Sequence, residues 1–281
     1  MLVFQGSIFQ KENKLSRLPL PRGVDTFDEF TVRVPGGAYT TFRTFEHDKA
    51  LRVEDHLERL QETAQLAGNP LRFESAKIRA DLRQIIDKYP QNKELRVRIV
   101  LDLYEYPGDI YYMSELLKTP GADAYQNGVK LITCSMRRYN PKAKLTRAIP
   151  RAEKIRSEFA VDVHEALMVD EDGRILEGLT SNFFAVKGGR LWTNESEVLS
   201  GVTRSLVIDA AEEAGLKLNL KSVTLSEILK IEEAFITSSS RAILPVVQID
   251  DQVIGEGKPG LITLRLMGCL EDRIHREIEP I

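Results

Sequence analysis

Residues 165–184 read EALMVDEDGRILEGLTSNFF, and they carry the most informative pattern in this 281-residue chain. Two apolar runs are separated by DEDG at 170–173, a cluster of residues that favours a turn. We therefore predict a strand, a turn and a second strand over 165–177, with Glu177 at the end of the second strand. Thr, Ser and Asn follow closely and supply hydrogen-bonding groups. Glu177 is thus a candidate catalytic acid or partner of a protonated ring nitrogen, and the alternative is a solvated turn residue.

Helix and strand patterns alternate on both sides of this stretch. Residues 54–67 place Leu57 and Leu60 at helical spacing, which predicts an amphipathic helix. A second helix is predicted over 75–88, and Pro90 stops it. The other predicted elements are strands at 95–104, 129–135, 165–170, 182–186, 191–193 and 233–238 and a helix at 203–214. The sequence therefore predicts a mixed α/β fold.

The length of the chain favours two domains over a single hydrophobic core. The sequence KTPGADAYQNG at 118–128 concentrates residues that break regular structure. We place an interdomain linker there, between a small N-terminal α/β domain at 1–117 and a larger C-terminal domain at 129–281. Two domains imply a crevice between them.

The composition excludes several classes of partner. A net charge of −3 and an isoelectric point near 5.9 supply no broad basic surface for nucleic acid or an anionic membrane. No apolar run approaches the roughly 20 residues of a membrane span, and the N-terminal residues lack the layout of a signal peptide. We therefore expect a cytoplasmic protein. The two cysteines and four histidines are scattered without metal-site spacing, so no metal is predicted.

Two further motifs offer groups that suit an anion. GVTR at 201–204 precedes the predicted helix at 203–214, and the free N–H groups of a helix N-terminus bind phosphate well. The alternative for Thr203 is a simple N-cap. FITSSSRAILPV at 235–246 runs from a strand into three serines, which are either further donors to the same anion or an ordinary loop.

A basic stretch supplies candidate nucleophiles. RRYNPKAKLTRAIPRAEK at 137–154 contains Lys142, Lys144 and Lys154. A lysine in a partly desolvated pocket loses its proton readily and forms a Schiff base with an aldehyde. Taken alone, the stretch is equally consistent with solvated surface lysines.

Together and in this order, the motifs resemble the class IV (fold type IV) pyridoxal phosphate (PLP) enzymes. This group includes branched-chain and D-amino acid aminotransferases and 4-amino-4-deoxychorismate lyases. The resemblance extends from GGAYTTFRTF at 36–45 through EDHLERL at 54–60 to the segment at 246–266, and it is most specific at 165–184. It implies the two-domain α/β fold of D-amino acid aminotransferases, with the cofactor in the interdomain crevice. It also implies a homodimer or a larger homo-oligomer.

The resemblance assigns cofactor roles to individual residues. Lys144 lies 33 residues before Glu177, the spacing that the family shows for its Schiff-base lysine. Lys142 is a near rival, whereas Lys154 lies too close to the motif. Glu177 is implied as the partner of the pyridine nitrogen, which keeps the ring protonated. The implied phosphate-binding residues are Arg59, Val202, Thr203 and Ser239.

Substrate recognition follows less directly from the resemblance. The implied substrate-binding residues are Tyr39, Arg43, Arg98 and Ser240. The alternative roles are a core tyrosine and two edge-strand arginines. The chain also departs from the family, because many relatives carry an acid after the aromatic residue where this chain has Thr40, and Leu179 replaces a small residue. Substrate specificity is therefore not carried over.

The resemblance implies a transaminase that moves an amino group between an amino acid or primary amine and a 2-keto acid. Two alternatives stay open: a 4-amino-4-deoxychorismate lyase using the same cofactor, and a non-catalytic interaction module with the same fold. The non-catalytic module predicts loss of Lys144 or of the phosphate-binding residues, and both are present. The identity and stereochemistry of the amino donor, and the preferred keto acid, are left open.

Overall fold

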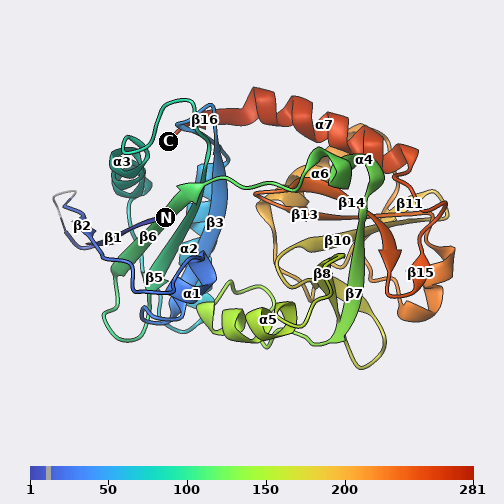
Figure 1. Cartoon of the computed structure of the whole chain (residues 1–281), viewed down its shortest axis with the longest axis horizontal. Coiled ribbons are helices and arrows are strands. Elements are labelled where there is room, and N and C mark those ends of the chain that lie inside the picture. Colours follow the sequence, from blue (N-terminus) through green and yellow to red (C-terminus); the bar gives the residue numbers. More distant parts are fainter. Residues whose placement is uncertain (11–13) are drawn as a thin grey trace. The chain divides into compact units, whose positions relative to one another are not determined.

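The computed structural model describes residues 1–10 and 14–281 (Figure 1). Contacts divide the chain into two compact units. The first unit contains Met1–Lys118, Ala143–Glu153 and Glu277–Ile281, and the second contains Thr119–Lys142 and Lys154–Arg276. Two short segments of the predicted C-terminal domain therefore pack with the first unit. The predicted linker at 118–128 includes a helix, α4 (Ala122–Asn127).

In the described part of the first unit, seven strands form an antiparallel sheet in the order β16-β4-β3-β5-β6-β1-β2 (Figure 1). The strands are β1 (Leu2–Ser7), β2 (Ser16–Arg17), β3 (Gly37–Phe45), β4 (Lys49–Leu51), β5 (Leu95–Asp102), β6 (Asp109–Leu116) and β16 (Ile278–Pro280). Side chains alternate along β3: Ala38, Thr40 and Phe42 are buried, whereas Tyr39 and Arg43 lie on the other face and are partly exposed.

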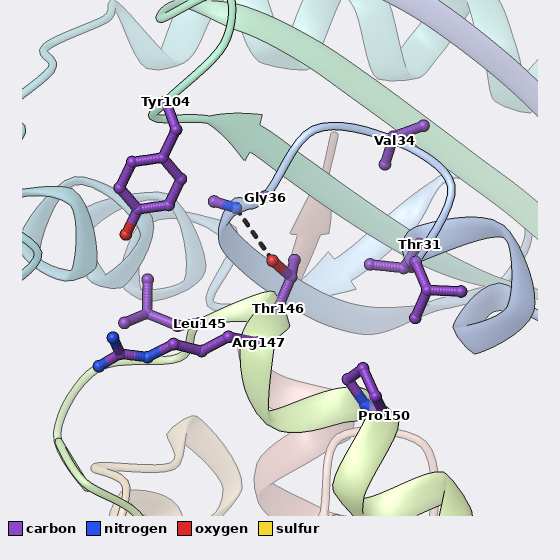
Figure 2. Close-up of a pocket in the computed structure, with 10 residues that line it drawn as sticks. Thr31, Val34, Gly36, Tyr104, Leu145, Thr146, Arg147 and Pro150 are labelled. Atoms are coloured by element: carbon purple, nitrogen blue, oxygen red, sulfur yellow. Dashed lines mark hydrogen bonds between the residues drawn. The ribbon is translucent and has the colours of Figure 1, made fainter.

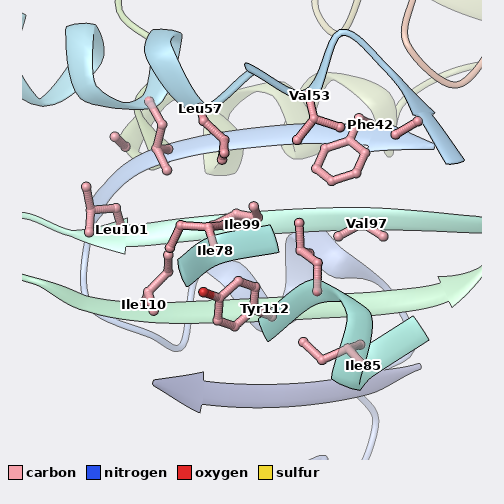
Figure 3. Packing of buried hydrophobic residues seen from close by; sticks show 14 of the residues in the cluster. Phe42, Val53, Leu57, Ile78, Ile85, Val97, Ile99, Leu101, Ile110 and Tyr112 are labelled. Carbon is pink, nitrogen blue, oxygen red and sulfur yellow. The ribbon is translucent and has the colours of Figure 1, made fainter. Parts of the chain in front are cut away.

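Two helices cover one face of this sheet: α2 (Val53–Leu66) and α3 (Ser75–Ile86). Their buried residues recur every three or four positions, which places them on one helical face. They pack against alternate residues of β5 and against Phe42 and Tyr112, as Figure 3 shows. The predicted helices at 54–67 and 75–88 are confirmed within two residues at each end.

The opposite face of the sheet is covered by α1 (Phe27–Thr31). This helix begins with a capping box, in which the Thr26 hydroxyl accepts from Glu29 N at 3.2 Å and the Glu29 carboxylate accepts from Thr26 N at 2.9 Å. Phe27 and Phe30 then pack with Val100 of β5. β5 is buried on both faces, and five of its eight residues are apolar; Arg96, Arg98 and Asp102 are the charged ones.

The second unit is built on a nine-stranded sheet, six strands of which close into a ring. Each neighbour in the series β10-β13-β14-β7-β8-β9 is paired, and β9 pairs back to β10. The strands are β7 (Val129–Ser135), β8 (Val163–Val169), β9 (Ile175–Gly178), β10 (Asn182–Lys187), β11 (Arg190–Trp192), β12 (Leu218–Asn219), β13 (Glu233–Ser238), β14 (Ala242–Ile249) and β15 (Gln252–Val253). The antiparallel pairing of β8 and β9 confirms the strand-turn-strand predicted at 165–177.

Helices complete the chain. They are α4, α5 (Ile149–Arg156), α6 (Val202–Glu213) and α7 (Leu261–Glu277), with 3₁₀ turns at Thr146–Ala148 and Leu225–Lys230. α6 confirms the helix predicted at 203–214. Within the described residues, we find no helix with the length and apolar character that a membrane crossing requires.

The packing of the first unit predicts how two leucine substitutions change its free energy of unfolding. Leu82 of α3 is fully buried, so Leu82→Ala leaves a cavity and should lower the free energy of unfolding by about 2–5 kcal/mol. Leu66 at the end of α2 is 50% exposed, and Leu66→Ala should change it by no more than about 0.5 kcal/mol. Urea denaturation measures both values. Equal effects of the two substitutions would contradict the packing of α3 described above.

Candidate active site

The backbone of Lys144 is fixed from two sides within the first unit. Its carbonyl oxygen accepts a hydrogen bond from Tyr39 N at 2.9 Å, and its N–H donates to Thr63 Oγ1 of α2 at 3.2 Å. Two residues later, Thr146 Oγ1 accepts from Gly37 N at 2.9 Å (Figure 2). The segment that contains Lys144 is therefore hydrogen-bonded to β3 at two points. The Lys144 side chain is half-buried, and its Nζ lies 4.7 Å from the centre of the Tyr39 ring.

Glycine at the start of β3 allows this strand to approach β5 closely. A Cβ at Gly37 would lie 1.8 Å from the carbonyl oxygen of Leu101 on the neighbouring strand, so only glycine fits. Residues on both sides of the contact line a cavity of about 230 Å³, among them Thr31, Val34 and Pro150 (Figure 2).

The two rival lysines have other surroundings. Lys142 belongs to the second unit, where its Nζ donates to the carbonyl oxygen of Glu195 and lies 3.5 Å from Ser200 Oγ. Burial and the Arg204 guanidinium lower the pKa of Lys142. Lys154 is exposed in the last turn of α5. Among the three lysines, only Lys144 combines a half-buried amine with a backbone held by both a strand and a helix.

Arg59 is buried in α2, and two neutral side chains contact it. Its Nη2 donates to Thr40 Oγ1 at 2.9 Å and lies 3.2 Å from His56 Nδ1. Burial, followed by the charges of Arg59 and Lys144, holds the pKa of His56 well below its usual value, so this imidazole is neutral. Sequence reasoning missed Thr40 and His56. The available signal was the spacing of His56 and Arg59, three residues apart on one helix.

Arg98 and Arg43 both lie next to carboxylates. Arg98 donates to Asp28 and stacks over Tyr39, with its guanidinium carbon 5.0 Å from the ring centre. Arg43 forms a salt bridge with Glu94. Tyr39 and Arg43 share a face of β3, as the alternation of the strand predicts. The Arg98 contacts suit a residue that holds the ring of Tyr39 in place.

Glu177 lies in the second unit, where its buried carboxylate accepts hydrogen bonds at one oxygen and lies near a cation at the other. One oxygen, Oε2, accepts from Asn182 Nδ2 at 2.9 Å and from Leu199 N at 3.2 Å. The other, Oε1, lies 3.4 Å from Arg138 Nε. Donors and a nearby cation stabilise the charged form of a carboxylate, so the site supports a buried negative charge.

Asn182 also links Glu177 to the N-terminus of α6. Its Nδ2 donates to the Leu199 carbonyl oxygen at 2.9 Å, and its Oδ1 would lie 2.2 Å from a Cβ added at Gly201. Gly201 is the N-cap residue of α6 and makes no side-chain capping hydrogen bond. The first turn of this twelve-residue helix contains Val202 and Thr203, both buried. It has the uncapped N–H groups and dipole that favour an anion.

The strand register places the serine run at the same end of the ring of strands as Glu177 and Asn182. Asn182 pairs with Glu177 on one side and with Thr237 on the other. β13 ends one residue after Thr237, so the half-buried Ser239 and Ser240 follow directly. The second unit thus gathers the predicted residues Glu177, Val202, Thr203, Ser239 and Ser240. The first unit gathers Tyr39, Arg59 and Lys144.

Residues 37–249 match the family model described as amino-transferase class IV. The chain belongs to the class IV aminotransferase family. This aminotransferase is 29% identical over 255 residues to the D-alanine aminotransferase of Bacillus licheniformis, covering 86% of this chain and 88% of that protein. It is 32% identical over 166 residues to the branched-chain-amino-acid aminotransferase of Pseudomonas aeruginosa, covering 57% and 54% of the two chains. The predicted family and enzyme class are confirmed.

Solved structures confirm the fold of this aminotransferase. The branched-chain aminotransferase of the archaeon Thermoproteus uzoniensis with norvaline has a TM-score of 0.76 at 23% identity, covering 100% of this chain and 99% of that one. The 4-amino-4-deoxychorismate lyase of Pseudomonas aeruginosa has a TM-score of 0.70 at 22% identity, covering 86% and 90%. Both reaction types therefore share this fold.

Class IV aminotransferases depend on PLP, and the residues of this chain fit that cofactor chemically. An aldehyde needs an amine, and Lys144 supplies a half-buried one. A protonated ring nitrogen needs a buried carboxylate, and Glu177 is one. A phosphate needs cations and N–H donors: the first unit contains the buried cation Arg59, and the second contains the N–H groups at the start of α6.

The neutral His56 predicts a pH dependence of stability. Because its folded pKa is lowered, the unfolded chain binds an extra proton below about pH 6.5, and stability should fall as pH drops through that range. The contribution of His56 approaches about 1.4 kcal/mol per pH unit. Urea denaturation of the cofactor-free chain between pH 5.5 and 7.5 should therefore show a shallower slope for His56→Asn than for wild type. His275→Asn changes an exposed histidine and should keep the wild-type slope, and equal slopes in all three proteins would refute the assignment.

Proposed function

We propose that this aminotransferase binds PLP through Lys144 and moves an amino group between an amino acid or primary amine and a 2-keto acid. The observation that carries the proposal is the half-buried Lys144 amine beside the Tyr39 ring, on a backbone bonded to both β3 and α2. A fixed backbone limits the positions that the amine can take, which favours reaction at one carbon atom.

The phosphate group is assigned to Arg59, Val202, Thr203 and Ser239. A phosphate ester carries about −1.5 to −2 charges, which one guanidinium, a helix N-terminus and a hydroxyl match in charge and geometry. Glu177 is assigned to the protonated ring nitrogen, because its buried carboxylate accepts two hydrogen bonds at Oε2 and lies 3.4 Å from Arg138 Nε at Oε1. Bound PLP supplies an electron sink for the bond that breaks at the substrate Cα.

Lys144 has a second task in this proposal. With an amino donor bound, the free amine of Lys144 would accept the proton from the substrate Cα and return it to the carbon that receives the amino group. Tyr39 packs beside this amine and limits its movement. One lysine thus provides both attachment and proton transfer.

Tyr39, Arg43, Arg98 and Ser240 stay the predicted substrate-side residues. Arg98 already holds Asp28 and Arg43 already holds Glu94, so a substrate carboxylate bound by either arginine has to share or replace a carboxylate. We propose small or branched aliphatic amino acids as donors, since relatives of this chain are named for D-alanine and for branched-chain amino acids. A homodimer or larger homo-oligomer and a cytoplasmic location stay predictions.

The proposed reaction makes a direct prediction. The PLP-loaded enzyme, given an amino donor and no acceptor, should release one equivalent of keto acid and leave the cofactor in its aminated form, which absorbs at a shorter wavelength. D-Alanine, L-leucine and simple primary amines are the first donors to screen. If every donor fails while aminodeoxychorismate yields pyruvate and 4-aminobenzoate, the enzyme is a lyase and the transaminase proposal is wrong.

The attachment site makes a second prediction. Borohydride reduction of the PLP-loaded chain, followed by peptide mass spectrometry, should find the label on Lys144. Lys144→Ala should abolish the label and reduce turnover by at least about 10³-fold, because attachment and proton transfer are lost together. Lys142→Ala is the matched control and should keep the label. A label on Lys142 or Lys154 in the wild-type chain would overturn the assignment.

A further inference from the structure

Two buried side chains beside Arg59 have no task in the proposed reaction. Thr40 and His56 are at most 1% exposed, and they come from different elements, β3 and α2. Thr40 Oγ1 lies 2.9 Å from His56 Nδ1, and Arg59 Nη2 lies 2.9 Å from the first atom and 3.2 Å from the second. The three polar groups form a closed triangle in the buried interior of the first unit.

The directions of these hydrogen bonds follow from what each group is able to do. A guanidinium only donates, so Nη2 directs its two N–H bonds at Thr40 Oγ1 and His56 Nδ1. A proton on Nδ1 would face these donors, so the imidazole carries its proton on Nε2 and accepts at Nδ1. The Thr40 hydroxyl oxygen accepts from Arg59 Nη2 at 2.9 Å and lies 2.9 Å from Nδ1. Both acceptors are therefore neutral, and neither repels an anion beside the guanidinium.

Neither acceptor has room to move. Thr40 pairs with Ile99 in the centre of the sheet, and its side chain is fully buried. The His56 ring packs against Phe42, with ring centres 5.3 Å apart. Arg59 is thus held by one rigid strand and by its own helix. A long side chain fixed in this way loses little conformational freedom when it binds a ligand.

We propose that Thr40 and His56 are positioning residues that orient the Arg59 guanidinium toward the phosphate group of the cofactor. The inference rests on the proposed function, because it takes Arg59 as a phosphate ligand. Thr40 and His56 touch neither the aldehyde nor the ring in this assignment. Their loss should therefore weaken recognition of the phosphate and leave the rest of the cofactor unaffected.

The test compares PLP with pyridoxal, which lacks the phosphate. Both are titrated into the cofactor-free full-length chain and followed by absorbance. Thr40→Val keeps the shape and removes the hydroxyl, and it should raise the Kd for PLP by about tenfold, as expected for a lost hydrogen bond to a charged group. The Kd for pyridoxal should change by less than about twofold. Thr40→Ser restores the hydroxyl and should return the PLP value close to wild type.

A second pair of variants repeats the comparison at His56. His56→Asn offers an amide oxygen close to the position of Nδ1 and should bind PLP better than His56→Leu, which offers no acceptor. This pair carries the test if Thr40→Val does not fold. The inference is overturned if PLP and pyridoxal weaken by the same factor, or if PLP binding is unchanged in Thr40→Val and His56→Leu. A wild-type chain that binds no PLP overturns the proposed function and the inference together. If PLP labels Lys144 normally and the variants keep the wild-type ratio of the Kd for PLP to the Kd for pyridoxal, the inference alone is overturned.

Discussion

The pairing of Glu177 with Asn182 is the contact on which the second unit depends. It joins β9 to β10 and closes six strands into a ring. The same two residues meet through their side chains, because the Asn182 amide donates to the Glu177 carboxylate at 2.9 Å. An ionised carboxylate in a protein interior is costly unless donors surround it. Here one asparagine both completes the sheet and offsets part of that cost.

In the first unit, the strand β3 likewise has two roles, because it contacts both the Lys144 segment and Arg59. Its peptide group lies between Tyr39 of β3 and Thr63 of α2, so the segment that carries the lysine is held by the core of the unit. Thr40, the next residue on β3, points to the opposite face of the sheet and contacts Arg59. Alternation along a single strand therefore serves two contacts, because the Tyr39 ring lies beside the amine and the Thr40 hydroxyl beside the guanidinium.

Local patterns in the sequence predicted local structure well. The DEDG turn marked the hairpin around Glu177, and leucines at helical spacing marked α2. The irregular composition at 118–128 was a poorer guide, because α4 forms between Gly121 and Gly128 within it. Contacts between residues far apart in the sequence could not be predicted from local patterns. Asp28 lies 70 residues from its partner Arg98, and Glu94 lies 51 residues from Arg43, so no spacing rule indicated that both arginines hold carboxylates. The triangle at Arg59 was missed because threonine and histidine are unremarkable until a fold buries them together.

The path of the chain has a consequence for how such an enzyme changes over evolutionary time. The first unit is assembled from three separate segments, and the short middle one, Ala143–Glu153, contains Lys144. No single cut yields the first unit with its lysine, and a gene fusion that exchanged residues 1–118 would leave that lysine behind. Exchange of residues 1–118 alone therefore separates Lys144 from the strand and the helix that hold its backbone, which favours change by substitution within an intact chain over exchange of whole modules.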